Sequence, residues 1–393
     1  MSGSTSPAVA SPAFASLPAR RLPGPLAAWS LGETGPLVVT VHGLAESSRY
    51  WTLPLSRLAD NHRAVTVDLL GFGRSPWPDL GYSAEGHADA LRATLDAAGL
   101  AGERAVVVGH QAGAAVALAY AGRYPDAVAS VVALGTPWFR SPGEARRALR
   151  GPWWLSRWLV EHEDRARLLC LTLCGGRRPL VPRLARWFAP ATMPAEVVED
   201  AFLHTWRSLS GTLASCWIEA SLPAVLGDRF AVPVLALHGD EDALVPVENL
   251  VDAAVTRPWL HVETLAGRGH NLAWDDPAAV AAIVDEAAQR LRHGSAGHDS
   301  LAVPAAAPRR RLAVPGLVAA EGDEITVAEA ARLARVERRT VIGWVAHGAV
   351  TARRGGNRLR VDRASLLRHV FGSDQPSATL LGSAWLSAAE AAA

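Results

Sequence analysis

The stretch VVVGHQAGAAVALAY, residues 106–120, combines three local signals that together decide the fold. Its first residues form a continuous apolar run, which is typical of a strand buried on both faces of a sheet. Gly109 and Gly113 then permit a tight turn, and the alanine-rich run behind the turn favours a helix. A buried strand followed directly by a helix predicts the repeating unit of a parallel α/β sheet.

The same alternation continues on both sides of this stretch. Apolar runs predict six buried strands: PLVVTVHG, RAVTVDLLG, RAVVVGH, VASVVALG, VPVLALHG and WLHVETLAG. Helical periodicity marks YSAEGHADALRATLDAAGL and PAAVAAIVDEAAQRLRH. We therefore expect an α/β domain with a doubly wound, mostly parallel sheet over residues 23–293. Between about residues 137 and 226 the alternation stops, and a tryptophan-rich helical segment predicts an inserted lid.

Length and composition place the chain among globular proteins with more than one domain, because 393 residues exceed an average domain. A net charge of +1 excludes a global field that would recruit nucleic acid or an anionic membrane. Neither a signal peptide nor an apolar run of about 18 residues is present, so we expect no membrane span and a cytoplasmic location. Cys170, Cys174 and Cys216 lack the spacing of a paired zinc site, and we expect no metal and no cofactor.

Segments of biased composition flank the predicted α/β domain. Residues 1–22 are rich in Ser, Pro and Ala and predict a disordered tail, and residues 294–323 predict a Pro/Ala-rich linker. Residues 324–371 carry ten arginines against four acidic residues, so the neutrality of the whole chain hides a basic module. Residues 372–393 form a C-terminal tail whose end, LSAAEAAA, resembles ITVAEAAR at 325–332. Two interpretations stay open, a truncated second module and an alanine-rich coincidence.

Motifs in the large domain follow its predicted strands in an order that resembles the α/β-hydrolase fold. The elbow of that fold presents the nucleophile on a strained strand-to-helix turn, and the acid and the histidine follow later in the chain. In this chain the matching motifs are VHGLAESSRYW for the oxyanion turn, VDLLGFGRS for the next loop, GHQAG for the elbow, HGDEDALVP for the acid loop and GRGHNLAWDDP for the histidine loop.

The resemblance assigns roles to individual residues. Asp242 would orient His270, and the backbone N–H groups of Leu44 and Ala112 would form the oxyanion hole. The remaining polar residues of these motifs have structural interpretations. We expect turn histidines at His42 and His110, and loop-stabilising side chains at Asp68 and Ser75.

The tip of the elbow departs from the family pattern, because Gln111 stands where the nucleophile belongs. A primary amide has no proton whose loss gives a useful nucleophile at neutral pH, so ordinary acyl-enzyme ester hydrolysis is not expected. Ser47 and Ser48 are the neighbouring hydroxyls that could replace the nucleophile. We expect a cavity beside the elbow, and three uses of it remain open. The cavity binds a small apolar ligand that Gln111 anchors, or it supports a reaction catalysed by the dyad of His270 and Asp242. In the third interpretation the cavity has no function of its own and the domain is a scaffold.

The basic module resembles an excisionase-type helix-turn-helix of the MerR-like winged group. Thr326 and Glu329 predict a capping box, ERRTVIGWVAHG predicts a second helix, and VTARRGGNRLRV predicts a hairpin wing. The resemblance implies DNA binding, and a solvated surface or a protein-interaction module is the alternative. The implied DNA contacts are Arg338, Arg339, Thr340, Arg353, Arg354, Arg358 and Arg360. A module this small buries little surface on DNA, so useful affinity needs either a homodimer or repeated binding sites on the DNA.

The leading hypothesis from the sequence is a small-molecule-responsive DNA-binding regulator. It joins an α/β-hydrolase-like domain without its serine to a C-terminal winged helix-turn-helix. The alternative is an enzyme that uses His270 and Asp242, either to hydrolyse an ester, lactone or C–C bond or for a non-hydrolytic reaction.

Overall fold

The computed structural model describes residues 14–79, 81–150, 161–174, 193, 195–219, 226, 230–254, 256–292, 309–311, 324–334, 341, 344–345, 350–355 and 358–371. The chain divides into two compact units. One comprises Met1–Ala254 and Pro258–Leu312, and the other comprises Ala313–Ala393 with Val255–Arg257.

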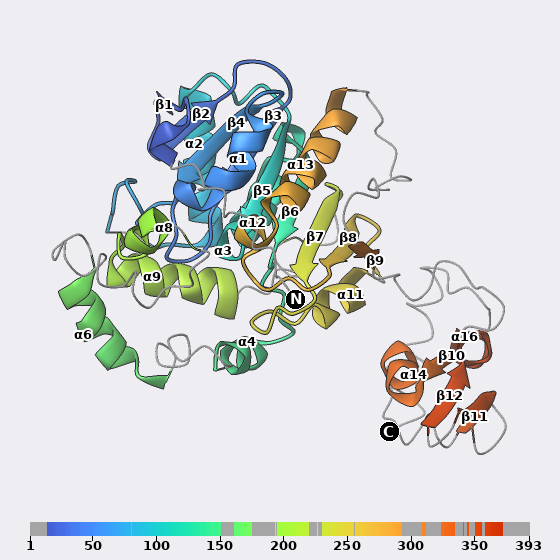
Figure 1. The fold of residues 1–393 in the computed structure, drawn as a ribbon. Helices are drawn as coiled ribbons and strands as arrows, with labels where there is room; N and C mark the ends of the chain where they lie inside the picture. Colours follow the sequence, from blue (N-terminus) through green and yellow to red (C-terminus); the bar gives the residue numbers. More distant parts are fainter. Residues whose placement is uncertain are drawn as a thin grey trace, which may run out of the picture. The chain divides into compact units, whose positions relative to one another are not determined.

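The first unit is built on a nine-stranded sheet in the order β1-β2-β4-β3-β5-β6-β7-β8-β9 (Figure 1). Its strands are β1 (Arg20–Leu22), β2 (Ala27–Leu31), β3 (Leu37–Val41), β4 (Arg63–Asp68), β5 (Ala105–His110), β6 (Val128–Leu134), β7 (Val234–Gly239), β8 (Leu260–Leu265) and β9 (Arg309–Arg311). Every neighbouring pair from β4 to β8 is parallel. The predicted mostly parallel sheet is therefore confirmed.

The order of the strands reverses beside β3. The chain passes from β3 to its neighbour β4 and then returns to place β5 on the other side of β3. In open α/β sheets a ligand binds outside the carboxyl ends of the strands at such a reversal. The turns after β3 and β5, which carry Leu44 and Gln111, meet at this point.

Helices cover both faces of the sheet. α1 (Thr52–Leu58) packs against α13 (Pro277–Arg292) on one face, and α2 (Ala84–Ala97) packs against α3 (Ala112–Arg123) on the other. Alternate strand residues point to α13, among them Val106, Val108, Leu235 and Leu237, and they form one buried core with Val280 and Val284 of that helix. The continuous apolar runs of the sequence thus reflect strands that are covered on both sides.

Between β6 and β7 the described residues form helices. These are α4 (Pro142–Leu149), α6 (Glu163–Leu173), α8 (Ala195–Asp200), α9 (Trp206–Leu213) and the π-helical turn η5 (Ala214–Ile218). Trp217 on η5 is buried, as is Trp138 before α4. The tryptophans at 153, 154, 158 and 187 lie outside the described residues, so the expected aromatic cover over the cavity stays a prediction.

Both edges of the sheet lie partly in segments for which the sequence predicted no structure. β1 lies within the expected tail and pairs with β2, while Phe14 farther upstream is buried and its N–H donates to Glu196. β9 lies within the expected linker and pairs antiparallel with β8. Edge strands are held on one side by backbone hydrogen bonds, which leave no apolar periodicity in the sequence.

The second unit contains a three-stranded antiparallel sheet in the order β10-β12-β11. Its elements are β10 (Glu324–Thr326), α14 (Val327–Ala334), β11 (Ala352–Gly355), β12 (Arg358–Asp362) and α16 (Arg363–Phe371). The predicted capping box is present, because the Thr326 N–H donates to Glu329 and the Glu329 N–H donates to the Thr326 hydroxyl. Most of the predicted second helix, including residues 338–340, lies outside the described residues.

Candidate active site

The candidate site lies at the carboxyl ends of the parallel strands. Leu44 follows β3, Gln111 follows β5, Asp242 follows β7 and His270 follows β8. Because all these strands run in the same direction, their following loops meet at one edge of the sheet. The structure brings all four residues into one hydrogen-bonded chain.

Gln111 is held in the strained turn between β5 and α3. Its backbone has φ 55° and ψ −117°, a left-handed conformation that residues with side chains rarely adopt. The N–H of Gln111 donates to the carbonyl of Leu134 on β6, and its own carbonyl accepts from Ala114 in α3. Ala112, the other predicted oxyanion donor, is the first residue of α3 and is buried beside this tip.

His270 and Asp242 form the expected pair. Nδ1 of His270 lies 2.8 Å from Oδ2 of Asp242, whose side chain is only 2% exposed. The second carboxylate oxygen accepts from the N–H groups of Leu244 and Val245. Burial opposes ionisation of Asp242, but the hydrogen bond and charge of His270 and the Leu244 N–H outweigh it and lower the pKa of the carboxyl. Asp242 is thus ionised, and one of its oxygens faces Nδ1 of His270.

The Gln111 amide bridges the oxyanion turn and the histidine. Its Oε1 accepts from the Leu44 N–H at 2.8 Å, and its Nε2 lies 3.2 Å from Nε2 of His270. Since Leu44 can only donate, the amide oxygen must face it and the amide nitrogen must donate to His270. Nε2 of His270 is then an acceptor, and Nδ1 carries the proton that is donated to Asp242. The dyad has the tautomer of a general base.

A second polar cluster at the same turn was not singled out from the sequence. The Glu46 carboxylate accepts from the Gly43 N–H at 2.7 Å and lies 3.2 Å from Nδ1 of His110. Burial disfavours the Glu46 charge, but the charge and hydrogen bond of His110 prevail and lower the pKa of Glu46. The ring of His110 stacks on Tyr50, with centroids 4.4 Å apart. An acidic residue three positions after Gly43, in the motif HGLAE, is the signal that could have indicated this contact.

His42 has the structural role expected of it. Its ring is fully buried, its Nδ1 lies 2.7 Å from the Gly43 carbonyl, and its Nε2 accepts from the Leu69 N–H. Asp68 accepts from the N–H groups of Ser48 and Arg74, and Ser75 donates to the Asp68 carbonyl. These contacts close the loop after β4.

Neither neighbouring serine is seen to take the place of the nucleophile. The Ser47 hydroxyl donates to Asp200 at 2.6 Å, and the Ser48 hydroxyl is buried without a hydrogen-bond partner among the described residues. Ser47 is therefore hydrogen-bonded to α8, whereas the side chain of His270 lies against Gln111 and Asp242.

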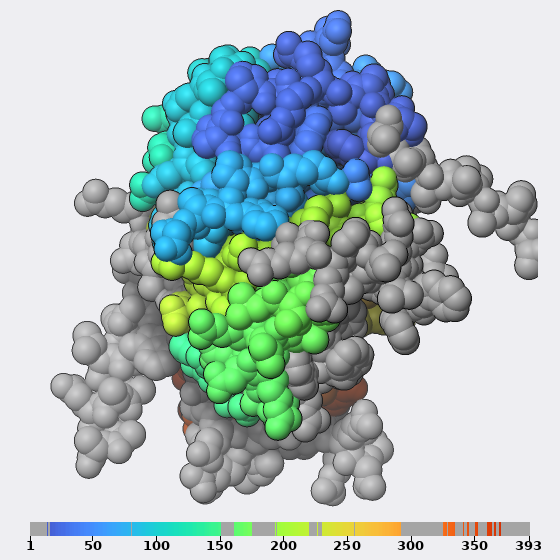
Figure 2. Space-filling view, turned by 90° about the vertical axis from the view of Figure 1, so that its left-hand side faces the viewer, coloured from blue at the N-terminus to red at the C-terminus, as the bar shows by residue number. Residues whose placement is uncertain are grey.

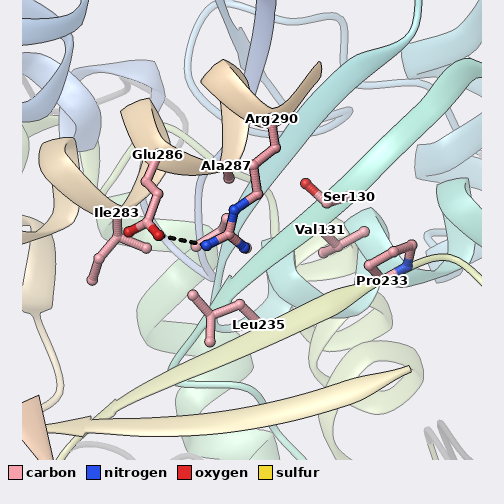
Figure 3. Close-up of a pocket in the computed structure, with 9 residues that line it drawn as sticks. Ser130, Val131, Pro233, Leu235, Ile283, Glu286, Ala287 and Arg290 are labelled. Carbon is pink, nitrogen blue, oxygen red and sulfur yellow. Dashed lines mark hydrogen bonds and ion pairs between the residues drawn. The ribbon is translucent and has the colours of Figure 1, made fainter. Parts of the chain in front are cut away.

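A small pocket lies away from this site, between α13 and the first halves of β6 and β7 (Figure 3). It is lined by Val131, Leu235 and Ile283, and by Glu286 and Arg290, whose side chains pair with each other. β6 and β7 begin here, at the edge of the sheet opposite the one that carries the dyad. The pocket therefore offers no access to His270.

The expected DNA contacts are only partly described. Arg353 and Arg354 lie on β11, and Arg358 and Arg360 lie on β12. Arg353 stands opposite Arg360 in the register, and Gly355 stands opposite Arg358. Arg338, Arg339 and Thr340 lie outside the described residues.

Among the residues that the structure describes, no helix has the length and apolar character needed to cross a bilayer.

Comparisons with known proteins agree on the large unit. The model of the alpha/beta hydrolase family matches residues 38–283. An uncharacterised protein of Mycobacterium tuberculosis is 26% identical over 278 residues, which cover 66% of this chain and 76% of the relative. The 2-(acetamidomethylene)succinate hydrolase of Mesorhizobium japonicum is 28% identical over 246 residues, covering 60% of this chain and 82% of the relative. The crystal structure of an E-2-(acetamidomethylene)succinate hydrolase superposes with a TM-score of 0.54 at 25% identity, over 68% of this chain and 97% of the other.

Proposed function

This chain belongs to the alpha/beta hydrolase family, and we propose that it is a hydrolase in which the His270–Asp242 dyad activates water directly. One observation carries the proposal. The dyad is hydrogen-bonded in the tautomer of a general base, whereas the elbow residue offers an amide in place of a nucleophile. The Mesorhizobium japonicum relative, which is named as a hydrolase, supports hydrolysis as the reaction class. The proposed substrates are esters, lactones or compounds with a hydrolysable C–C bond.

The reaction would begin with displacement of the Gln111 side chain. A substrate carbonyl oxygen takes over the Leu44 N–H that the Gln111 oxygen occupies, and the amide nitrogen turns to hold a water beside Nε2 of His270. Water then attacks the carbonyl carbon while its proton passes to Nε2, and Asp242 stabilises the imidazolium. The same proton is delivered to the leaving group as the tetrahedral intermediate collapses. No acyl-enzyme forms.

This mechanism predicts slow turnover. In a comparable triad, loss of the serine costs about 10⁶ in kcat and leaves roughly 10³–10⁴ over the uncatalysed reaction. We expect the proposed enzyme to accelerate hydrolysis by only about 10³–10⁴ over the uncatalysed reaction, unless its substrate is unusually reactive. A slow hydrolase is also compatible with the alternative in which Gln111 anchors a bound ligand instead of assisting a reaction.

A panel of esters and lactones tests the proposal. We expect turnover without a product burst and loss of that turnover in His270→Ala. In Gln111→Ala turnover should be lower but still measurable, because the amide nitrogen helps to hold the water while the dyad remains intact. A serine-directed fluorophosphonate should not label His270→Ala or the parent chain at residue 111. Turnover that survives His270→Ala would contradict the mechanism. No turnover on any substrate, with ligand binding lost in Gln111→Ala, would favour the ligand-sensing function.

DNA binding by the second unit is a second candidate, and the arginine register favours it. Arg353 and Arg360 stand directly opposite each other on β11 and β12. Like charges in opposite positions of an antiparallel pair destabilise the sheet, so an anionic partner along this hairpin would relieve the repulsion. Phosphates of duplex DNA supply such charges, and a homodimer would double the contact area.

Fluorescence anisotropy with duplex DNA at several salt concentrations tests this candidate. Arg353→Ala with Arg354→Ala should weaken binding and reduce the salt slope by about one for each lost phosphate contact. Arg338→Ala with Arg339→Ala tests the predicted recognition helix in the same assay. Arg123→Ala in the first unit is the control, because Arg123 pairs with Asp89 on an exposed surface. Unchanged affinity and slope in both double variants would overturn DNA binding.

A further inference from the structure

Three side chains that can bind a metal converge within the segment between β6 and β7, outside the dyad. Cys170 lies in the last turns of α6, Cys174 is the residue that ends this helix, and His204 lies between α8 and α9. The two sulfurs and a ring nitrogen of His204 all lie within 4.8 Å of one another. Figure 2 shows the surface of α6 in green beside the yellow-green surface of α8 and α9.

His204 lacks the hydrogen bonds that a buried imidazole needs. The residue is only 5% exposed, and neither ring nitrogen hydrogen-bonds to any residue that the structure describes. Its ring neighbour is Phe72, at a centroid distance of 6.1 Å, which offers no acceptor. Buried polar groups are nearly always satisfied, and an exception points to a water or an ion that completes the site.

The two cysteines lie one helical turn apart at the end of α6. Cys174 caps the helix and its N–H donates to the Cys170 carbonyl at 2.9 Å, and the two sulfurs lie within 4.8 Å of each other. Donor atoms around one tetrahedral zinc ion lie about 3.3–3.8 Å apart, as follows from Zn–S of about 2.3 Å and Zn–N of about 2.0 Å. The three donors need to approach one another by at most about 1–1.5 Å to reach this geometry.

We propose that Cys170, Cys174 and His204 bind a zinc ion or another thiophilic divalent cation. Two thiolates and an imidazole are the donor types that zinc prefers, and three protein ligands leave a fourth position for water or a small thiol. Binding releases the thiol protons, as it does in other thiolate sites. The sequence alone pointed away from a metal, because the third ligand comes from a distant segment.

The site would fasten α6 to the edge of the active-site region. The residue before His204, Leu203, accepts from the Gly73 N–H at 2.8 Å, and His204 itself forms a β-bridge with Phe72. Both contacts are to the loop after β4. An ion shared between α6 and His204 therefore ties the helix, through this bridge, to the loop that follows the sheet.

Metal analysis of the untagged full-length chain, purified without chelator and without oxygen, tests the proposal. We expect about one equivalent of zinc in the parent chain and binding weakened by more than about 100-fold in Cys170→Ser and His204→Ala. Cys216→Ser is the matched control, because Cys216 is a buried free thiol in η5 and should leave the zinc content unchanged.

Two further measurements separate metal binding from damage to the fold. His204→Cys supplies another soft ligand and should retain the zinc that His204→Ala loses. Cobalt added to the metal-free chain should give thiolate-to-cobalt charge-transfer bands that vanish in Cys170→Ser and persist in Cys216→Ser. Zinc content at background, equal zinc in all variants, or a Cys170–Cys174 disulfide in the anaerobic protein would overturn the proposal.

Discussion

Gln111 keeps the backbone of a nucleophile elbow without the side chain of a nucleophile. Its left-handed conformation costs on the order of 1–3 kcal/mol for a residue with a side chain. The cost is met by the surrounding turn, in which the Gln111 N–H donates to Leu134 and its carbonyl accepts from Ala114. Because the backbone is fixed by these neighbours, the side chain at this position can be exchanged without rebuilding the turn.

Gln111→Ser should therefore create serine-hydrolase activity. The change removes the amide oxygen from the Leu44 N–H and leaves a hydroxyl beside Nε2 of His270. We expect ester turnover to rise by at least about tenfold, within the roughly 10⁶ that a serine contributes in a comparable triad. Labelling by a fluorophosphonate and a burst of product are the measurements. Gln111→Ser combined with His270→Ala is the control, and an unlabelled Gln111→Ser would show that the hydroxyl and the imidazole are misaligned.

Asp242→Asn should change the tautomer of His270. The carboxylate accepts the Nδ1 proton, whereas the Asn amide nitrogen can donate to Nδ1, so the proton moves to Nε2. Histidine ¹⁵N correlations in labelled protein report the tautomer directly and need no substrate. Where turnover is measurable, a loss of about 10⁴ in kcat is expected, as in a serine-protease triad with the same change. An unchanged Nδ1–H tautomer would mean that other contacts fix the ring. Asp240→Asn, on the neighbouring exposed residue, is the control.

At the scale of elements, the elbow works because α3 starts directly against the end of β3. A Cβ at Gly113 would lie 2.3 Å from the His42 carbonyl oxygen and 2.4 Å from that of Val41. Gly109 and Val41 also stand opposite each other where β5 pairs with β3. The turn can therefore carry the tip of the elbow only if the helix approaches the strand without a side chain between them.

Gly113→Ala should destabilise the first unit, while Gly122→Ala in the same helix should not. The methyl group at 113 meets backbone atoms that cannot move aside, and we expect a loss of about 1–3 kcal/mol in the free energy of unfolding. At 122 the nearest atoms are side-chain carbons 3.8 Å away, and alanine favours the helix by up to about 1 kcal/mol. Urea unfolding followed by tryptophan fluorescence measures both. Equal stability of the two variants would contradict the packing argument.

Elements differ in how well the sequence predicts them. The six parallel strands are predicted because burial on both faces leaves continuous apolar runs, such as Val106 to Val108. The edge strands β1 and β9 are not predicted, since they are held by backbone hydrogen bonds, which leave no apolar pattern in the sequence. The order of the motifs brings Asp242 and His270 together, but it gives no sign of the Gln111 bridge to Leu44, which depends on one side-chain rotamer. His204 reaches Cys170 only through the packing of α6 against the segment before α9.

At the scale of the whole chain, the two units differ in what holds them together. The first has a core that spans both faces of its sheet, whereas the second has a small core formed by residues such as Ala330, Val341 and Leu366. Small domains bury a smaller share of their surface and are correspondingly less stable. The unfolding of each unit therefore has to be followed by a probe within that unit, and tryptophan fluorescence serves mainly for the first, which carries 12 of the 14 tryptophans in the sequence.

The first unit should lose stability as the pH falls from about 6.5 to 4, because it buries neutral histidines. Burial lowers the pKa of His87 to about 3, with a smaller contribution from His42, and lowers that of His238 to about 4. In the unfolded chain both titrate near 6.5, so below that pH the unfolded state binds protons that the folded state refuses. Stability is then complete above about pH 7 and falls with decreasing pH until each folded pKa is reached. At pH 5 the loss is about 2 kcal/mol for each histidine, at about 1.4 kcal/mol per pH unit.

Urea unfolding at pH 7.5, 6.0 and 5.0, followed by tryptophan fluorescence, measures this slope. His87→Gln and His238→Gln should each reduce it, since glutamine takes up no proton, and His42, whose pKa burial also lowers, keeps part of the slope. Each variant also loses some stability at pH 7.5 from altered hydrogen bonds to Thr212 or to the Thr136 N–H. His162→Gln, at an exposed ring, is the matched control. If the two buried-site variants kept the slope of the parent chain, carboxylates such as Asp242 would have to carry the acid sensitivity. Their lowered pKa places that loss below about pH 4, so the pH at which stability begins to fall distinguishes the two causes.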